Sequence, residues 1–253
     1  MTALICQVTS RWPVAKVSTY GTLDVNSVAR LMVSLRDSLA DGPSALMIDV
    51  THLVVAADSA LVPLIALANE AALWPAALIL LGGASGETAA AAERVGFGDR
   101  VRVYPDADAA AAVARDLPVS RRRTMTLHPG PSAPSQSRDF TTAVCAEWEL
   151  GRVASLAELV ASELVTNAVM HARTEIGMAL RLSGDTLSVA VRDFDPRPMI
   201  RPESNGFGAP TDEHGRGLLL LDAMADAWGS TPTADGKVVW ANISVRKSRP
   251  TRA

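Results

Sequence analysis

The sequence predicts an α/β protein of two domains, and three observations support this fold class. The first half alternates short apolar strand-like runs with helix-like runs, which is typical of a layered α/β domain. Residues 118–137 join three consecutive arginines to a run rich in Pro, Gly and Ser, a composition typical of a linker. The second half combines a long helix with a cleanly alternating strand. We therefore expect a first domain at 1–117, a linker at 118–137, a second domain at 138–246 and a basic tail at 247–253.

The elements of the first domain follow from its hydrophobic pattern. Strands are predicted over Leu4–Val8, Val14–Ser18, Ala45–Val50, Ala76–Leu81 and Val101–Tyr104, and helices over Val25–Leu39, about 60–73, Glu87–Val95 and Asp106–Arg115. Residues 61–81 are apolar enough to raise the question of a membrane span. Asn69, Glu70 and Pro75 interrupt this run, so we expect a helix, a turn and a strand in a core instead.

In the second domain, a helix from about Leu156 to His171 is expected to place polar side chains among apolar ones. At roughly 100° per residue, one stripe contains Leu156, Leu159, Val160, Leu164 and Ala168. Glu163, Asn167 and His171 fall inside this stripe. Burying a carboxylate and an amide costs several kcal/mol unless hydrogen bonds or a metal compensate. Either a buried polar network ties the helix to a loop, or this face is the floor of a polar ligand pocket.

Two later segments supply further candidate residues. Thr186–Asp193 alternates as a strand, and Asp193 ends the strand on its inward face, where it is either a ligand acceptor or a simple turn residue. Gly215, Arg216 and Gly217 lead into an apolar run over 218–228, predicted to be a helix closed by Gly229. The free N–H groups of a helix start favour phosphate, although Gly-x-Gly alone more often marks a tight turn.

Taken in this order, these segments resemble the ATPase superfamily shared by gyrase, sensor histidine kinases and a heat-shock chaperone, and in particular its anti-sigma factor serine kinase branch. The resemblance covers about residues 130–246 and includes the run Asp235-Gly-Lys-Val-Val-Trp-Ala. After Asp193 the chain reads Phe-Asp-Pro-Arg-Pro, whereas the superfamily prefers glycines. The Pro- and Gly-rich segment 196–214 is expected to form a lid.

The resemblance implies ATP and Mg²⁺ as cofactors and assigns a role to each candidate residue. Asn167 would coordinate the Mg²⁺ that bridges the phosphates, and Glu163 would act as general base on a serine hydroxyl. Asp193 would accept a hydrogen bond from the adenine amino group. Gly215, Arg216 and Gly217 would lie in the lid over the phosphates, with His171 in a supporting role. These assignments agree with phosphoryl transfer, which needs positioning, charge neutralisation and a proton acceptor.

The first domain resembles another family, the STAS domains, which include the anti-sigma factor antagonists. The residues that carry the resemblance are Gly21-Thr-Leu-Asp24, Leu46-Met-Ile-Asp49-Val and Asp58-Ser59-Ala-Leu, and it covers about residues 1–116. It implies that Ser59 is a phosphoacceptor, whereas an ordinary helix cap by Asp58 or Ser59 is the alternative. The chain departs from the antagonists at Ala60 and Leu61, where they usually carry a serine and a glycine.

Composition limits the function classes. A formal net charge of −3 argues against nonspecific binding of nucleic acid, and 48% hydrophobic with 20% charged residues is typical of a soluble globular protein. Cys6 and Cys145 have no metal-ligand spacing, and the first residues lack the pattern of a signal peptide. We therefore expect a cytoplasmic protein that contacts neither nucleic acid nor membrane.

The sequence thus predicts an ATP-dependent serine kinase fused to an antagonist-like domain. Its expected partners are a sigma factor, a separate STAS antagonist or a second copy of the chain, and its phosphorylation target is Ser59 or a serine of a separate antagonist. Two alternatives remain: a switch that binds ATP and sequesters a partner without turnover, and an adaptor that docks through its STAS-like half.

Overall fold

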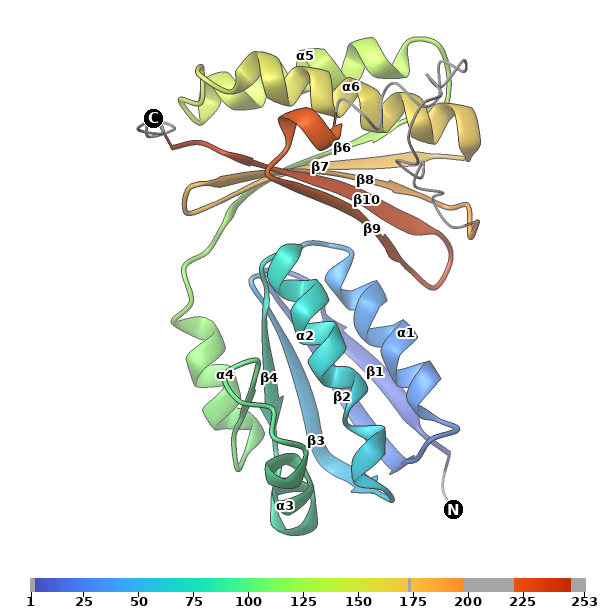
Figure 1. Ribbon diagram of the computed structural model, residues 1–253, viewed down its shortest axis with the longest axis vertical. Coiled ribbons are helices and arrows are strands. Elements are labelled where there is room, and N and C mark those ends of the chain that lie inside the picture. Colours follow the sequence, from blue (N-terminus) through green and yellow to red (C-terminus); the bar gives the residue numbers. More distant parts are fainter. Residues whose placement is uncertain (1–2, 173, 198–220, 247–253) are drawn as a thin grey trace, which may run out of the picture. The chain divides into compact units, whose positions relative to one another are not determined.

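The computed structural model describes residues 3–172, 174–197 and 221–246, and these form two compact units, Met1–Val119 and Ser120–Ala253. Each unit contains its own five-stranded sheet and its own apolar core. Figure 1 shows the helices of each unit beside its sheet. The fold class predicted from the sequence, two α/β domains, is confirmed. Among the described residues, no helix is long and apolar enough to cross a membrane.

The first unit is a mixed sheet with helices on both faces. Its strands lie in the order β1-β2-β3-β4-β5, with β1 antiparallel to β2 and the remaining neighbours parallel. The elements in chain order are β1 (Ile5–Ser10), β2 (Val14–Leu23), α1 (Val28–Leu39), β3 (Ala45–Val55), the 3-10 turn η1 (Asp58–Ala60), α2 (Pro63–Leu73), β4 (Leu78–Gly82), α3 (Gly86–Val95), β5 (Val101–Val103) and α4 (Ala107–Arg115). The run 61–81 is therefore helix, turn and strand, as its interrupting polar residues predicted.

Two separate apolar clusters hold this unit together. The larger cluster packs α1, α2 and α3 against the sheet through residues such as Leu35, Leu64 and Ile48. A smaller cluster around Met47 and Leu80 packs α4 against the opposite face. Because both faces are covered at the centre, most of residues 45–50 of β3 and most of β4 are buried, which is typical of parallel strands.

The second unit is an antiparallel sheet with two long helices on one face (Figure 1). The strand order is β6-β7-β8-β10-β9, and every pairing is antiparallel. In chain order the elements are β6 (Arg121–Leu127), α5 (Ala133–Glu147), α6 (Ala154–His171), β7 (Ile176–Ser183), β8 (Thr186–Asp193), β9 (Ala227–Pro232) and β10 (Lys237–Ser244).

The prediction of a linker over residues 118–137 is wrong for most of that range. The three arginines belong to β6, which pairs with β7 from Arg121 opposite Leu182 to Leu127 opposite Ile176. The Pro-rich run ends in the first turn of α5, where Pro134 lies at a position whose backbone N–H would have no helical partner. Arginine is compatible with an edge strand, where charged side chains remain in water. Composition alone therefore misjudged a segment whose structure depends on pairing with β7.

The helix predicted over 218–228 is also too long. The described residues 221–224 are helical, but Ala227–Pro232 form β9, with Trp228 opposite Ala241. Gly229 is not a helix cap: a Cβ added there would lie 2.8 Å from the Trp240 ring, so a glycine lets that ring pack against the strand. Apolar periodicity does not separate a helix end from the start of a short buried strand.

Candidate functional site

Helix α6 carries Glu163, Asn167 and His171, the polar residues singled out from the sequence. Its buried residues include Val160, Leu164 and Ala168 of the predicted apolar stripe. Glu163 and Asn167 are half-buried, whereas His171 is exposed as the last residue of the helix. Solvent exposure of the polar side chains is therefore greatest at the C-terminal end of α6.

Strand pairing brings a lysine to the predicted acceptor Asp193. In the antiparallel pair of β8 and β10, Lys237 lies directly opposite Asp193, so both side chains project from the same face of the sheet. Gly236 makes this approach possible, since a Cβ at this position would lie 2.0 Å from the Asp193 carbonyl oxygen. The run Asp235-Gly-Lys thus has a structural reason for its glycine.

Asp193 and Lys237 form a buried ion pair. Asp193 is 2% exposed and Lys237 is 7% exposed. The Lys237 Nζ donates to Asp193 Oδ1 at 3.0 Å and to the backbone oxygen of Asp195 at 3.2 Å. The Asp195 N–H also donates to Asp193 Oδ1, at 3.0 Å. A buried carboxylate of this kind must be paired or bound to remain charged, and the lysine meets that need.

Asp195 and Arg197 form a second charged pair beside the first. The Arg197 guanidinium donates from Nε to Asp195 Oδ2 at 2.8 Å and from a terminal nitrogen to the same oxygen at 2.5 Å. Hydrogen bonding by Arg197 lowers the pKa of Asp195 to about 2. The same terminal nitrogen donates to the His171 backbone oxygen at 2.6 Å, which satisfies a carbonyl at the C-terminus of α6.

These elements enclose a pocket of about 210 Å³. Apolar side chains of α6, β8 and β10 line part of the pocket, and charged side chains at the ends of β8 and β10 line the rest. The lining residues are Leu164, Asn167, Ala168, His171, Val191, Asp193, Asp195, Arg197, Lys237 and Val239. Ligand sites are typically apolar clefts with a few placed polar groups, and a volume of this size suits part of a nucleotide, such as a base, better than the whole.

One polar atom in this pocket has no partner. The Asn167 Nδ2 is buried and makes no hydrogen bond within the part of the chain that the structure describes. An unsatisfied buried polar atom costs about 1–3 kcal/mol, so it favours a bound ligand over a purely structural role. Rotation about the last side-chain bond exchanges the amide oxygen and nitrogen, so Asn167 also has a hard oxygen ligand suited to Mg²⁺. The residues present therefore fit a Mg²⁺–nucleotide ligand.

The structure brings together only some of the predicted site residues. Asn167 and Asp193 line the same pocket, whereas Glu163 is not among the described residues that line it. Gly215, Arg216 and Gly217 lie outside the described residues, as does most of the expected lid. The described residues hold no cluster of three or more His, Cys, Asp or Glu that could bind a metal ion, so Asn167 remains a single predicted Mg²⁺ ligand.

Sequence reasoning missed three lining residues, Asp195, Arg197 and Lys237. Lys237 lies in the run that carried the ATPase resemblance, but its partner is 44 residues away. The Phe-Asp-Pro-Arg-Pro departure after Asp193 was the available signal for Asp195 and Arg197. That segment replaces the expected glycines with a charged pair at the pocket.

Ser59, the predicted phosphoacceptor, lies in the first unit. It is exposed within η1, just before α2 begins at Pro63. Its neighbour Asp58 accepts two hydrogen bonds from Arg94 of α3, at 2.6 and 3.0 Å, and this lowers the pKa of Asp58. Asp58 therefore forms an ion pair with Arg94 of α3, whereas Ser59 is exposed to solvent.

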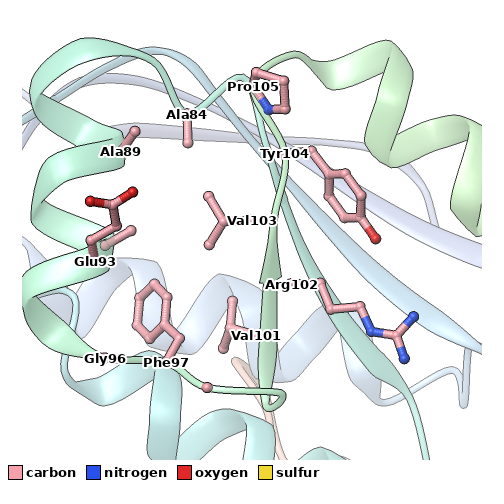
Figure 2. A pocket seen from close by; sticks show the side chains of 12 residues that line it. Ala84, Ala89, Glu93, Gly96, Phe97, Val101, Arg102, Val103, Tyr104 and Pro105 are labelled. Carbon is pink, nitrogen blue, oxygen red and sulfur yellow. The ribbon is translucent and has the colours of Figure 1, made fainter.

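A larger hollow of about 690 Å³ also lies in the first unit, between α3 and the edge strand β5 (Figure 2). Val101, Val103 and Phe97 surround it, with Glu93 of α3 on the opposite side. None of the predicted site residues that the structure describes lines it. Its described lining is mainly apolar and includes no unsatisfied buried polar atom, so it is the weaker candidate for a nucleotide.

Comparison with protein families agrees with the fold of the second unit. Residues 130–243 match the model of the histidine kinase-like ATPase domain. These residues form a histidine kinase-like ATPase domain, and an ATPase domain implies that ATP binds there.

Individual proteins are also similar to parts of the chain. An uncharacterized protein from Streptomyces coelicolor is 39% identical over 82 residues, which cover 31% of this chain and 75% of that protein. The crystal structure of an anti-sigma factor antagonist from Mycobacterium paratuberculosis gives a TM-score of 0.38 with 22% sequence identity, covering 45% of this chain and 96% of that chain.

Proposed function

We propose that this protein is an ATP-dependent serine protein kinase of the anti-sigma factor type. It phosphorylates an antagonist serine, either Ser59 or a serine of a separate STAS protein, and controls a sigma factor by partner switching. The observation that supports this proposal most is the pocket of the ATPase domain, where a buried carboxylate and an unpartnered amide face the same space.

The pocket residues divide into two roles. Leu164, Ala168, Val191 and Val239 form apolar walls suited to a flat base, and Asp193 accepts from its amino group. Asn167 would hold Mg²⁺ through its amide oxygen, and the ion would supply neutralisation of the phosphate charge there.

Phosphoryl transfer then needs a proton acceptor, which we assign to Glu163. The serine Oγ forms a bond to the γ-phosphorus while the bond from that phosphorus to the β,γ-bridging oxygen breaks, and ADP leaves. Glu163 takes the hydroxyl proton. It lies one turn before Asn167 on α6, about 6 Å along the helix axis, on the same rigid element.

Ser59 fits the part of acceptor because it is exposed at the start of a helical segment. The N–H groups of Ala60 and Leu61 already donate to the backbone oxygens of Ala57 and Asp58, so it is the exposure of Ser59 that makes it accessible to a kinase. We therefore assign the first unit as a STAS domain of the antagonist type. Its mixed sheet, with α1 to α3 on one face and α4 on the other, supports this assignment.

A second candidate is an ATP-loaded switch that sequesters its partner without turnover. The position of Glu163 favours it, since this carboxylate does not line the described pocket. In an adaptor, by contrast, partner binding would not depend on nucleotide at all. Partner capture with ATP, with ADP and without nucleotide separates these two.

The proposal is tested by incubating the purified protein with Mg²⁺ and γ-labelled ATP, alone and with added STAS protein. Label on Ser59 or on the added protein is expected. Glu163→Gln is expected to bind ATP normally and to lose transfer. ATP binding without label on any acceptor would establish the switch instead, and unchanged transfer in Glu163→Gln would rule out that residue as the base.

A further inference from the structure

Among the described residues that line the pocket, only Lys237 carries a buried positive charge, and neither the motif roles nor the proposed chemistry uses it. It lies opposite Asp193 in the β8–β10 pair, and both side chains line the pocket. Two described hydrogen bonds occupy the ammonium group, to Asp193 Oδ1 and to the Asp195 backbone oxygen. An ammonium carries three donors, so one N–H remains for a ligand in the pocket.

The two oxygens of the Asp193 carboxylate differ in their hydrogen bonds. Both of its described hydrogen bonds, from Lys237 Nζ and from the Asp195 N–H, reach Oδ1. Oδ2 is therefore the oxygen that can accept from a ligand. The strand end thus presents an acceptor and a donor side by side, from two residues that the sheet register holds together.

A donor beside an acceptor matches one edge of adenine. The amino group at position 6 is a donor, and ring nitrogen N1 next to it is an acceptor. We propose that Lys237 is a specificity-determining residue of the nucleotide pocket: its ammonium donates to N1 of adenine while Asp193 accepts from the 6-amino group. This inference rests on the proposed ATP binding and adds the second half of base recognition to it.

A purely structural ion pair makes a different prediction. If Lys237 served only to neutralise Asp193, affinity would not depend on whether the ligand carries a nitrogen at position 1. If Lys237 donates to N1, loss of that nitrogen leaves a buried ammonium N–H without its partner, and binding weakens.

The test measures binding of ATP and of 1-deaza-ATP, in which N1 is a C–H group, to the full-length protein by isothermal titration calorimetry. We expect the wild type to bind 1-deaza-ATP roughly tenfold or more weakly than ATP, as loss of a hydrogen bond to a charged group implies. Lys237→Met is expected to bind both ligands with equal, weakened affinity. Lys16→Met, which removes a lysine of the first unit, serves as the matched control and should discriminate as the wild type does.

Three outcomes decide the matter. Equal binding of the two ligands by the wild type overturns the role of Lys237, and this comparison needs no variant to fold. Discrimination that persists in a folded Lys237→Met protein overturns it as well. The triphosphate of purine riboside, which lacks the 6-amino group, tests Asp193 separately. Absence of any ATP binding by the wild type would overturn the proposed function, and the role of Lys237 with it.

Discussion

Asn167 separates two explanations of the polar face of α6. In a structural network, its amide would be hydrogen-bonded to neighbouring groups, and its loss would destabilise the fold. Instead, the Nδ2 is buried without a partner in the described part of the chain, and it lies at a pocket that also contains Asp193. The unsatisfied atom therefore favours a ligand, which was only one of the two alternatives open from the sequence.

Asn167→Ala should accordingly affect binding far more than stability. Because the amide nitrogen has no partner among the described residues, its removal breaks no hydrogen bond and relieves the cost of burying it, so we expect the free energy of unfolding not to fall. ATP affinity should fall by at least about tenfold, as loss of a charge-assisted contact implies. Denaturant unfolding and ATP titration measure the two quantities. A large loss of stability with unchanged affinity would support the structural network.

Asp195 gives a prediction about pH. Arg197 holds the pKa of this carboxyl at about 2, below the ordinary value of 3.8. A carboxyl with a lowered folded-state pKa stabilises the fold above its unfolded-state pKa, and this contribution is lost as the pH falls from about 4 through about 2. Carboxyl NMR titration should show the Asp195 pKa rising toward 3.8 in Arg197→Ala. An unchanged pKa in that variant would mean that Arg197 is not its cause.

At the scale of elements, β6 and α5 show where composition misleads. Three consecutive arginines and a Pro-rich run are typical of a linker, yet the arginines pair with β7 and the prolines precede a helix of 15 residues. The connection between the units is left with residues 116–120, between the end of α4 and the start of β6. By contrast, α6 and β8 were predicted well, because their apolar periodicity is long and regular.

Fragments of the chain can test the position of this boundary. A fragment of residues 120–253 retains β6 and all of α5, so we expect it to unfold cooperatively in denaturant. A fragment of residues 138–253, which begins at the end of the sequence-predicted linker, lacks β6 and the first turn of α5. It should expose the edge of β7 and lose cooperative unfolding. Equal stability of the two fragments would show that β6 contributes nothing to this unit.

At the scale of the whole molecule, the short connection bears on how the kinase reaches Ser59. Five residues, 116–120, join the last helix of the first unit to the first strand of the second, and they span at most about 18 Å. A flexible linker of 20 residues would have favoured transfer within one chain through a high local concentration. A short connection restricts the approach of Ser59 to the pocket, so we expect transfer between molecules.

Mixing two variants tests this expectation. Ser59→Ala keeps the pocket but lacks the acceptor, and Asn167→Ala keeps the acceptor but lacks the proposed Mg²⁺ ligand. Neither should label itself with γ-labelled ATP. Mixed together, the Asn167→Ala chain, distinguished by a size tag, should become labelled at a rate that rises with the Ser59→Ala concentration. Label in the wild type but none in the mixture would show that transfer occurs within one chain.

The sequence by itself determined the two-domain α/β class, the ATPase family of the second unit and the pairing of Asn167 with Asp193 as candidate site residues. These depend on local periodicity and on motifs whose residues lie within a few turns of one another. Only the tertiary structure shows that Lys237 pairs with Asp193 in the pocket and that Arg197 links Asp195 to the last residue of α6. Only the tertiary structure shows, too, that the predicted linker contains a strand. The reason is physical: each of these depends on strand register or contact between distant segments, and a local pattern does not encode which distant segment will lie opposite it.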